Sequence, residues 1–147
     1  MKKFLLFAVL VLQFISVSAK KITSADSLRV FYTQYFLLDV KLEDENQLNL
    51  LVSSSSTQDF YTAWYKDVYD IGLYDPLTRG AGGDSKDVDF MIKSLSVIKE
   101  KDYYTVSFKF HGWQGNINEY TVYVYVNKEG KISHTRRPTD GYITPEE

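Results

Sequence analysis

The stretches "YYTVSFKF" (residues 103–110) and "EYTVYVYVN" (residues 119–127) decide the fold, because apolar and polar side chains alternate in both. Alternation with a period of two is typical of a β-strand that buries one face. The even-numbered side chains form the predicted buried face: Tyr104, Val106, Phe108, Phe110, Tyr120, Val122, Val124 and Val126. The pattern therefore predicts neighbouring antiparallel strands with one covered face and one open face.

Two further strands are predicted around this pair. The segment "SLSVIKEKD" (94–102) is a less regular strand on the N-terminal side. On the C-terminal side, "NKEG" (127–130) has the composition of a hairpin turn, and "KISHTRR" (131–137) follows as the last strand. In this last strand His134 has the same parity as Ile132, which predicts a hydrogen-bonded structural histidine.

The first half of the chain has helical periodicity instead. A helix is expected over 23–42, with Thr23 and Asp26 at its N-terminal cap. Its apolar stripe consists of Leu28, Phe31, Tyr35, Leu38 and Leu42. A second helix is expected over 43–52, ended by the serines 53–56. A third begins near Ser56 and Asp59, with one face formed by Phe60, Trp64, Val68 and Ile71.

Helices followed by an antiparallel meander predict an α+β fold, with the N-terminal helices packed on a curved antiparallel sheet. We expect the helices to cover the face made by the even-numbered strand residues. The tyrosines of opposite parity, Tyr103, Tyr123 and Tyr125, then face outward. Interfaces are enriched in tyrosine, so this face is a candidate partner surface; strands also favour tyrosine without any binding role.

The first 19 residues, "MKKFLLFAVLVLQFISVSA", resemble a cleaved secretory signal, with two lysines, an apolar run and small residues at the end. The mature chain is then 20–147, a single α+β domain with a loose tail over 138–147. No later stretch is apolar enough to span a membrane. An exported chain of this size without cysteine fits a periplasmic or secreted location in a Gram-negative bacterium.

Composition and motifs exclude several functions. The net charge of −2 becomes about −4 without the leader's lysines, which argues against nucleic-acid binding. The absence of cysteine removes thiol nucleophiles and thiolate metal sites, and no P-loop, zinc-protease or nucleophile-elbow motif is present. The carboxylates Asp84, Asp87 and Asp89 lack the spacing of a calcium loop. We therefore predict no metal and no cofactor.

We expect the mid-chain stretch "GLYDPLTRGAGGDSKDVDF" (72–90) to be a connector between the helices and the sheet. Its largest functional role would be to form the rim of a pocket. Within it, Asp75 and Arg79 are candidate ligand-binding residues, since an arginine can grip a carboxylate. The structural alternative is that Asp75 caps a turn and that Arg79 pairs with Asp75 or faces solvent. His111 and Trp113 are the candidates in the next loop, as a general base and a partner anchor; a glycine-containing hairpin loop is the other interpretation.

Four segments carry a resemblance to a known family: "DSLRVFYTQYFLLD", "YDPLTRGAGGDSKD", "SLSVIKEKDYYTVSF" and "VYVNKEGKISHTRRP". Together they resemble small exported bacterial proteins, a domain of unknown function with a cystatin-like, nuclear-transport-factor-like cone. The resemblance implies a curved sheet wrapped around helices, with a pocket at the open end, and it implies no activity. Gly82, Gly83 and Asp84 depart from the family's pattern after the shared "YDP".

The favoured interpretation is an exported, non-enzymatic binding module whose ligand is another protein or a small molecule. A toxin-neutralising immunity-type protein is one version, with Trp113, Tyr123 and Tyr125 carrying the contact; a homodimer through the same face is another. The alternative is a small lyase or isomerase with an acid–base pair in the cone, for which Asp39, Asp75, Tyr35 and Tyr104 supply the residue types. A structural component of an envelope complex is the third.

Overall fold

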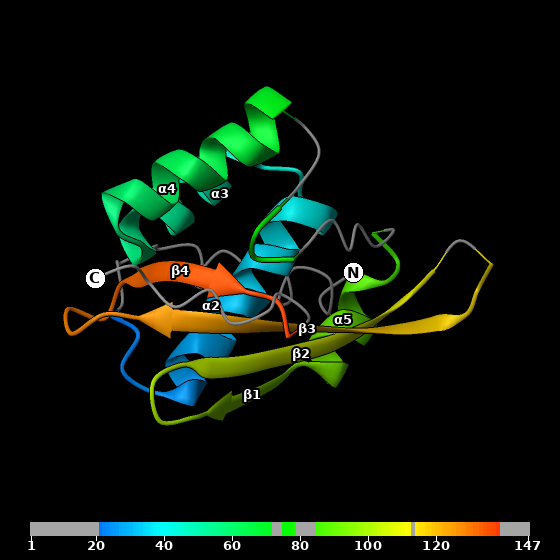
Figure 1. Cartoon of the computed structure of the whole chain (residues 1–147). Coiled ribbons are helices and arrows are strands. Elements are labelled where there is room, and N and C mark those ends of the chain that lie inside the picture. Colours follow the sequence, from blue (N-terminus) through cyan, green and yellow to red (C-terminus); the bar gives the residue numbers. More distant parts are fainter. Residues whose placement is uncertain (1–20, 72–74, 79–84, 113, 139–147) are drawn as a thin grey trace, which may run out of the picture.

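The computed structural model describes residues 21–71, 75–78, 85–112 and 114–138. Within these ranges helices precede a single antiparallel sheet (Figure 1). The helical elements are α2 (Ala25–Phe36), the π-helix η1 (Leu37–Lys41), α3 (Glu45–Ser55), α4 (Gln58–Tyr65), the π-helix η2 (Lys66–Ile71) and α5 (Val88–Ser94). The strands are β1 (Ser96–Lys99), β2 (Tyr104–His111), β3 (Ile117–Val126) and β4 (Ile132–Arg136), in the order β1-β2-β3-β4. The predicted α+β class is confirmed.

The buried face of the sheet is the predicted one. Val106 and Val122 are opposite each other in the β2–β3 register, and both are fully buried together with Val124. Helix α2 passes behind the sheet in Figure 1 and packs on this face, where the rings of Phe36 and Phe108 meet edge to face at 4.8 Å. Apolar burial of this kind is the main stabilising contribution in a domain of this size. The other face, toward the viewer in Figure 1, carries no described helix.

The cap of the first helix differs from the prediction by one residue. Ser24 is the N-cap, and its hydroxyl accepts a hydrogen bond from the Ser27 amide, while the Ser27 hydroxyl accepts from the Ser24 amide. This reciprocal pair satisfies free amides of the first turn, so Thr23 and Asp26 are not needed as caps. The regular helix ends at Phe36 and continues as η1, which leaves Leu42 exposed rather than within the apolar stripe.

The serine run does not break the second helix where we expected. Asp44 caps α3, which extends to Ser55. Ser53 and Ser54 lie within its last turn, where their hydroxyls donate to carbonyls of the preceding turn. Thr57, not Ser56, is the N-cap of α4. Ser56 instead forms an isolated parallel bridge to the start of β4.

The third helix is shorter than predicted and passes into η2 after Tyr65. Phe60 and Trp64 are buried as expected, and Val68 is partly buried. The prediction was wrong for Ile71, which lies at the end of η2 and is exposed. A π-turn adds one residue per turn, so it rotates later side chains away from the stripe of a regular helix.

Helix α5 was missed by the sequence analysis, which assigned its residues to the connector and to the first strand. The strand is correspondingly short, Ser96–Lys99 instead of 94–102. Val88 and Met91 of α5 are fully buried, and this tertiary burial stabilises a helix of seven residues that has no side-chain cap. Because this helix depends on tertiary packing, the local sequence pattern did not predict it.

The hairpin between β3 and β4 is confirmed, but its register holds a bulge. The Gly130 amide donates to the Asn127 carbonyl, with Gly130 at φ +77°. Tyr125 is opposite His134 and Val126 is opposite Ile132, so Ser133 is the extra residue.

No helix within the described ranges is long and apolar enough to cross a bilayer.

Candidate functional site

A row of aromatic side chains lies on the open face of the sheet, at the end of β3 that meets β4. The ring centroid of Tyr103 is 4.7 Å from that of Tyr123 and 5.4 Å from that of Tyr125. The Tyr125 ring stacks on His134 at 3.9 Å with an interplanar angle of 14°. The Arg136 guanidinium lies 5.8 Å from the Tyr123 centroid. We call these five residues the aromatic face.

The register explains why these side chains meet. Tyr125 is opposite His134 and Tyr123 is opposite Arg136, while Tyr103 immediately precedes β2 at the level of Tyr125. Opposite residues on adjacent antiparallel strands have Cβ atoms close enough for direct side-chain contact. The three tyrosines therefore lie on the open face, as the sequence predicted, and each is partly buried.

His134 lies on the open face despite its parity with buried Ile132. The sequence predicted a hydrogen-bonded structural histidine, and His134 Nδ1 lies 3.3 Å from Ser133 Oγ. The bulge at Ser133 reverses the alternation and turns the imidazole outward onto Tyr125. One extra residue on a strand has this effect because side chains alternate with a period of two. No sequence signal for the bulge is present in "KISHTRR".

Electrostatics keeps the His134 ring neutral. Partial burial lowers the pKa of His134 below its usual value, and the positive charge of Arg136 lowers it further. At neutral pH the aromatic face therefore carries a single cationic group at its β4 edge, the Arg136 guanidinium over the Tyr123 ring.

Small hydroxyl side chains and one exposed isoleucine surround the aromatic face. Ile98 on β1 is 55% exposed and lies opposite Thr105 on β2, which in turn lies opposite Tyr123. The hydroxyls of Ser107 and Thr121 are 3.0 Å apart in the next row. The tyrosine rings, each partly exposed, thus adjoin short side chains and one more exposed isoleucine.

His111 does not belong to this face. It ends β2, eight residues from Tyr103, which is roughly 26 Å along a strand. Its Nδ1 is 2.5 Å from Asp87 Oδ1, its backbone amide donates to Asp87 Oδ2 at 2.7 Å, and its ring stacks on Phe90 at 4.6 Å. Trp113, predicted as its neighbour in the site, lies outside the described residues.

The Asp87 carboxylate has a structural role at the edge of β2. Beyond the end of β1 the amides of Lys109 and His111 have no strand partner, and they donate to Ser94 Oγ and to Asp87 Oδ2. Side chains of α5 thus replace the missing strand, which protects an otherwise open sheet edge. Among the described residues no three metal-binding groups converge, and Asp84 lies outside the described ranges.

Asp75 is the centre of a second, mostly buried cluster. Its Oδ2 accepts hydrogen bonds from the Tyr35 hydroxyl at 2.7 Å and from the Thr78 hydroxyl at 2.5 Å. Its Oδ1 accepts from the Leu77 amide at 2.8 Å, and Trp64 Nε1 donates to the Tyr35 oxygen at 3.0 Å. Asp75 therefore caps its turn, as one interpretation of the sequence had it, and also ties that turn to α2 and α4. Arg79, the predicted partner of Asp75, lies outside the described residues.

A second carboxyl, Asp39 of η1, interacts electrostatically with this cluster. Burial raises the pKa of Asp39 to about 6, and the negative charge of Asp75 contributes to the rise. Burial also raises the pKa of Asp75, although its hydrogen bonds oppose the rise, and burial next to Asp75 raises the pKa of Tyr35. Burial, Glu45 and Asp39 raise the pKa of Tyr69 to about 12. The tyrosines are therefore neutral donors, and Asp39 titrates close to neutrality.

Of the four acid–base residue types considered from the sequence, the fold brings three together and separates one. Tyr35, Asp39 and Asp75 share the cluster, whereas Tyr104 lies on β2 and lines a pocket elsewhere. Tyr35 and Asp75 are 40 residues apart in the chain, and no local pattern could have indicated their contact.

The fold is shared with a solved structure. The crystal structure of a protein of unknown function from Bacteroides thetaiotaomicron VPI-5482 superposes with a TM-score of 0.56 at 15% sequence identity. The superposition covers 74% of this chain and 84% of the Bacteroides chain. No family model matches the sequence, and no curated protein does. At this identity the likeness concerns the fold alone.

Proposed function

We propose that this protein is a non-enzymatic binding module, and that its aromatic face binds another protein. The observation that carries the proposal is the contiguous contact of Tyr103, Tyr123, Tyr125 and His134 on the sheet face without a described helix. Tyrosine and arginine are among the residues enriched where proteins bind each other, because each combines a large contact area with a polar end.

The geometry favours a protein partner over a small molecule on this face. The side chains come from β2, β3 and β4 and lie side by side across a sheet, and such an arrangement suits another broad surface. The partner's chemistry follows from the groups present: apolar side chains over the tyrosine rings, and a carboxylate facing Arg136 at the β4 edge.

The setting of this proposal comes from the sequence. The first 19 residues support export to the periplasm or the outside of a Gram-negative bacterium. The sequence also resembles exported proteins with a cystatin-like cone, and we include this resemblance in the proposal because it supports the same exported location. An immunity-type protein that neutralises a toxin is one partner relationship of this kind.

Site-specific photo-crosslinking in the periplasm of the producing cell tests the proposal. We expect a benzoyl-phenylalanine at position 123 or 125 to give a discrete crosslinked heterocomplex, and Arg136→Glu to remove it. The matched control is the same label at Tyr65, a tyrosine of α4 that is 41% exposed on the helical side. A crosslink of equal strength from position 65, none from 123 and 125, or a product of twice the chain mass would overturn the heterologous partner.

The enzyme alternative has one observation in its favour, the convergence of Tyr35, Asp39 and Asp75. A carboxyl with a pKa of about 6 next to a neutral tyrosine suits proton abstraction near neutral pH. Against it, Asp75 already accepts hydrogen bonds from its own turn and from Tyr35. Deuterium uptake by cyclohexanone in D₂O, catalysed by the protein and lost in Asp39→Asn, would favour the enzyme; unaccelerated uptake would count against it.

A further inference from the structure

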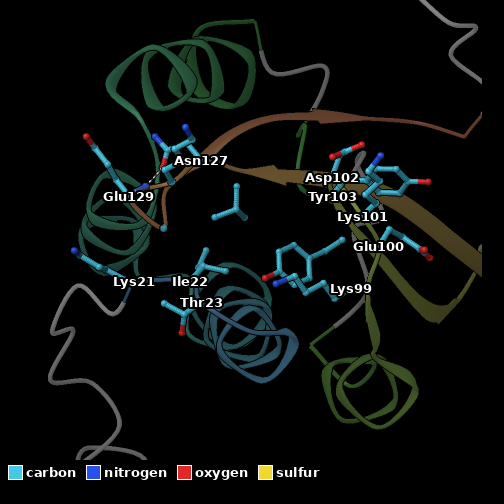
Figure 2. A pocket seen from close by; sticks show the side chains of 14 residues that line it. Lys21, Ile22, Thr23, Lys99, Glu100, Lys101, Asp102, Tyr103, Asn127 and Glu129 are labelled. Carbon is cyan, nitrogen blue, oxygen red and sulfur yellow. Dashed lines mark hydrogen bonds between the residues drawn. The ribbon is translucent and has the colours of Figure 1, made fainter.

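A polar pocket of about 380 Å³ lies at the end of the sheet where three separate segments meet (Figure 2). They are the start of the described chain at 21–23, the turn between β1 and β2 at 99–104, and the turn between β3 and β4 at 126–130. Its volume falls in the range of pockets that hold small molecules. Neither the predicted site residues nor the proposed partner face accounts for it, although Tyr103 borders both.

The walls of the pocket combine apolar and cationic groups. Ile22 and Tyr104 are almost fully buried, and Val126 is partly buried, so these three provide an apolar floor. The Lys99 ammonium lies 5.9 Å from the centroid of the Tyr104 ring, within the range of a cation–π contact. Lys99 itself is exposed, and this contact places its charge beside the apolar floor.

The charged groups around the pocket favour an anion. Four lysines and three acidic residues line it: Lys21, Lys99, Lys101, Lys128, Glu100, Asp102 and Glu129. None of these lysines forms an ion pair with another described residue. The Glu100 carboxylate accepts a hydrogen bond from Thr105 on the open face of the sheet. Figure 2 shows Lys99 directed toward the middle of the pocket, while the carboxylates of Glu100 and Glu129 point away from it.

We propose that this pocket binds a small organic anion with an apolar body, whose carboxylate meets Lys99 and whose body packs on Ile22, Tyr104 and Val126. A carboxylate there receives a charge-assisted hydrogen bond from Lys99. The apolar body covers the remaining exposed part of the floor, chiefly Val126, because Ile22 and Tyr104 are already almost fully buried. An ammonium ligand of the same shape would meet the Lys99 charge with the wrong sign. The site adjoins the aromatic face at Tyr103, but the residues proposed to bind the anion are not members of that face.

Amide chemical shifts of the ¹⁵N-labelled protein test this assignment, with benzoate, benzyl alcohol and benzylammonium as probes. We expect benzoate to shift the amides of residues 99–104 and 126–130 with a millimolar dissociation constant, and the neutral and cationic probes to bind at least about tenfold more weakly. Equal shifts from all three probes, or no shifts from benzoate at these amides, would overturn the proposal.

Three lysine variants distinguish specific binding at Lys99 from non-specific attraction of the anion to surface lysines. Lys99→Met keeps most of the side-chain length and should weaken benzoate binding by roughly tenfold or more, whereas Lys99→Arg should retain it. Lys93→Met removes an exposed lysine of α5 outside the pocket and should leave binding unchanged. Unchanged benzoate affinity in Lys99→Met, with the remote amides confirming a native fold, refutes the role of Lys99.

Discussion

The charge on the Asp39 carboxyl destabilises the folded protein at neutral pH, and removing that charge should raise stability there. Its pKa rises from 3.8 to about 6 on folding, first because of burial and then because of Asp75. A raised pKa means that the folded state holds the proton more tightly than the unfolded state. The stabilising effect of that proton is complete below pH 3.8 and is lost as the pH rises through 6.

The size of the effect follows from the shift. Each pKa unit corresponds to about 1.4 kcal/mol, so the two-unit rise sets an upper value of about 3 kcal/mol. Asp39 is only partly buried, and solvent screening reduces this to about 1–2 kcal/mol. We therefore expect Asp39→Asn to raise the melting temperature by roughly 4–8 °C at pH 8. Near pH 3, where Asp39 is protonated in both states, the two proteins should be equally stable.

Urea and thermal unfolding at pH 3, 5, 6 and 8, followed by tryptophan fluorescence, to which buried Trp64 contributes, measure this difference. Asp70→Asn is the matched control, because Asp70 is exposed in η2 and its replacement should have little effect at any pH. The reasoning is refuted if Asp39→Asn is no more stable than the natural protein at pH 8. It is refuted equally if the gain persists unchanged at pH 3.

Two further predictions concern the framework of the sheet. Asp87→Ala should destabilise the protein by about 2–3 kcal/mol in urea unfolding, because the His111 amide and ring lose their hydrogen-bond acceptor. Asp89 is exposed, so the control Asp89→Ala should change stability by less than about 0.5 kcal/mol. Gly130→Ala should cost about 1–2 kcal/mol more than Gly115→Ala, although both have positive φ, because a Cβ at 130 would approach the N-terminal segment to 2.9 Å while 115 is open. Equal costs within either pair would contradict the corresponding contact.

The sequence by itself determined the class of fold and the orientation of the sheet. Alternation over 104–110 and 120–126 specifies which side chains share a face, and the apolar face must be the buried one. Val122 and Val124 are accordingly in the core, and Tyr123 and Tyr125 are outside it. The first three helices were predicted for a similar reason. The caps of the first and third were wrong by one residue, because neighbouring serines and threonines can each serve as the cap.

Only the tertiary structure decided what these elements bring together. Helix α5 forms because Val88 and Met91 are buried, and His134 faces outward because of one bulged residue. The Asp39–Asp75 cluster and the pocket around Lys99 each join segments that are distant in sequence. Periodicity encodes the direction of a side chain relative to its own backbone, whereas the neighbours of that side chain depend on how separate segments pack.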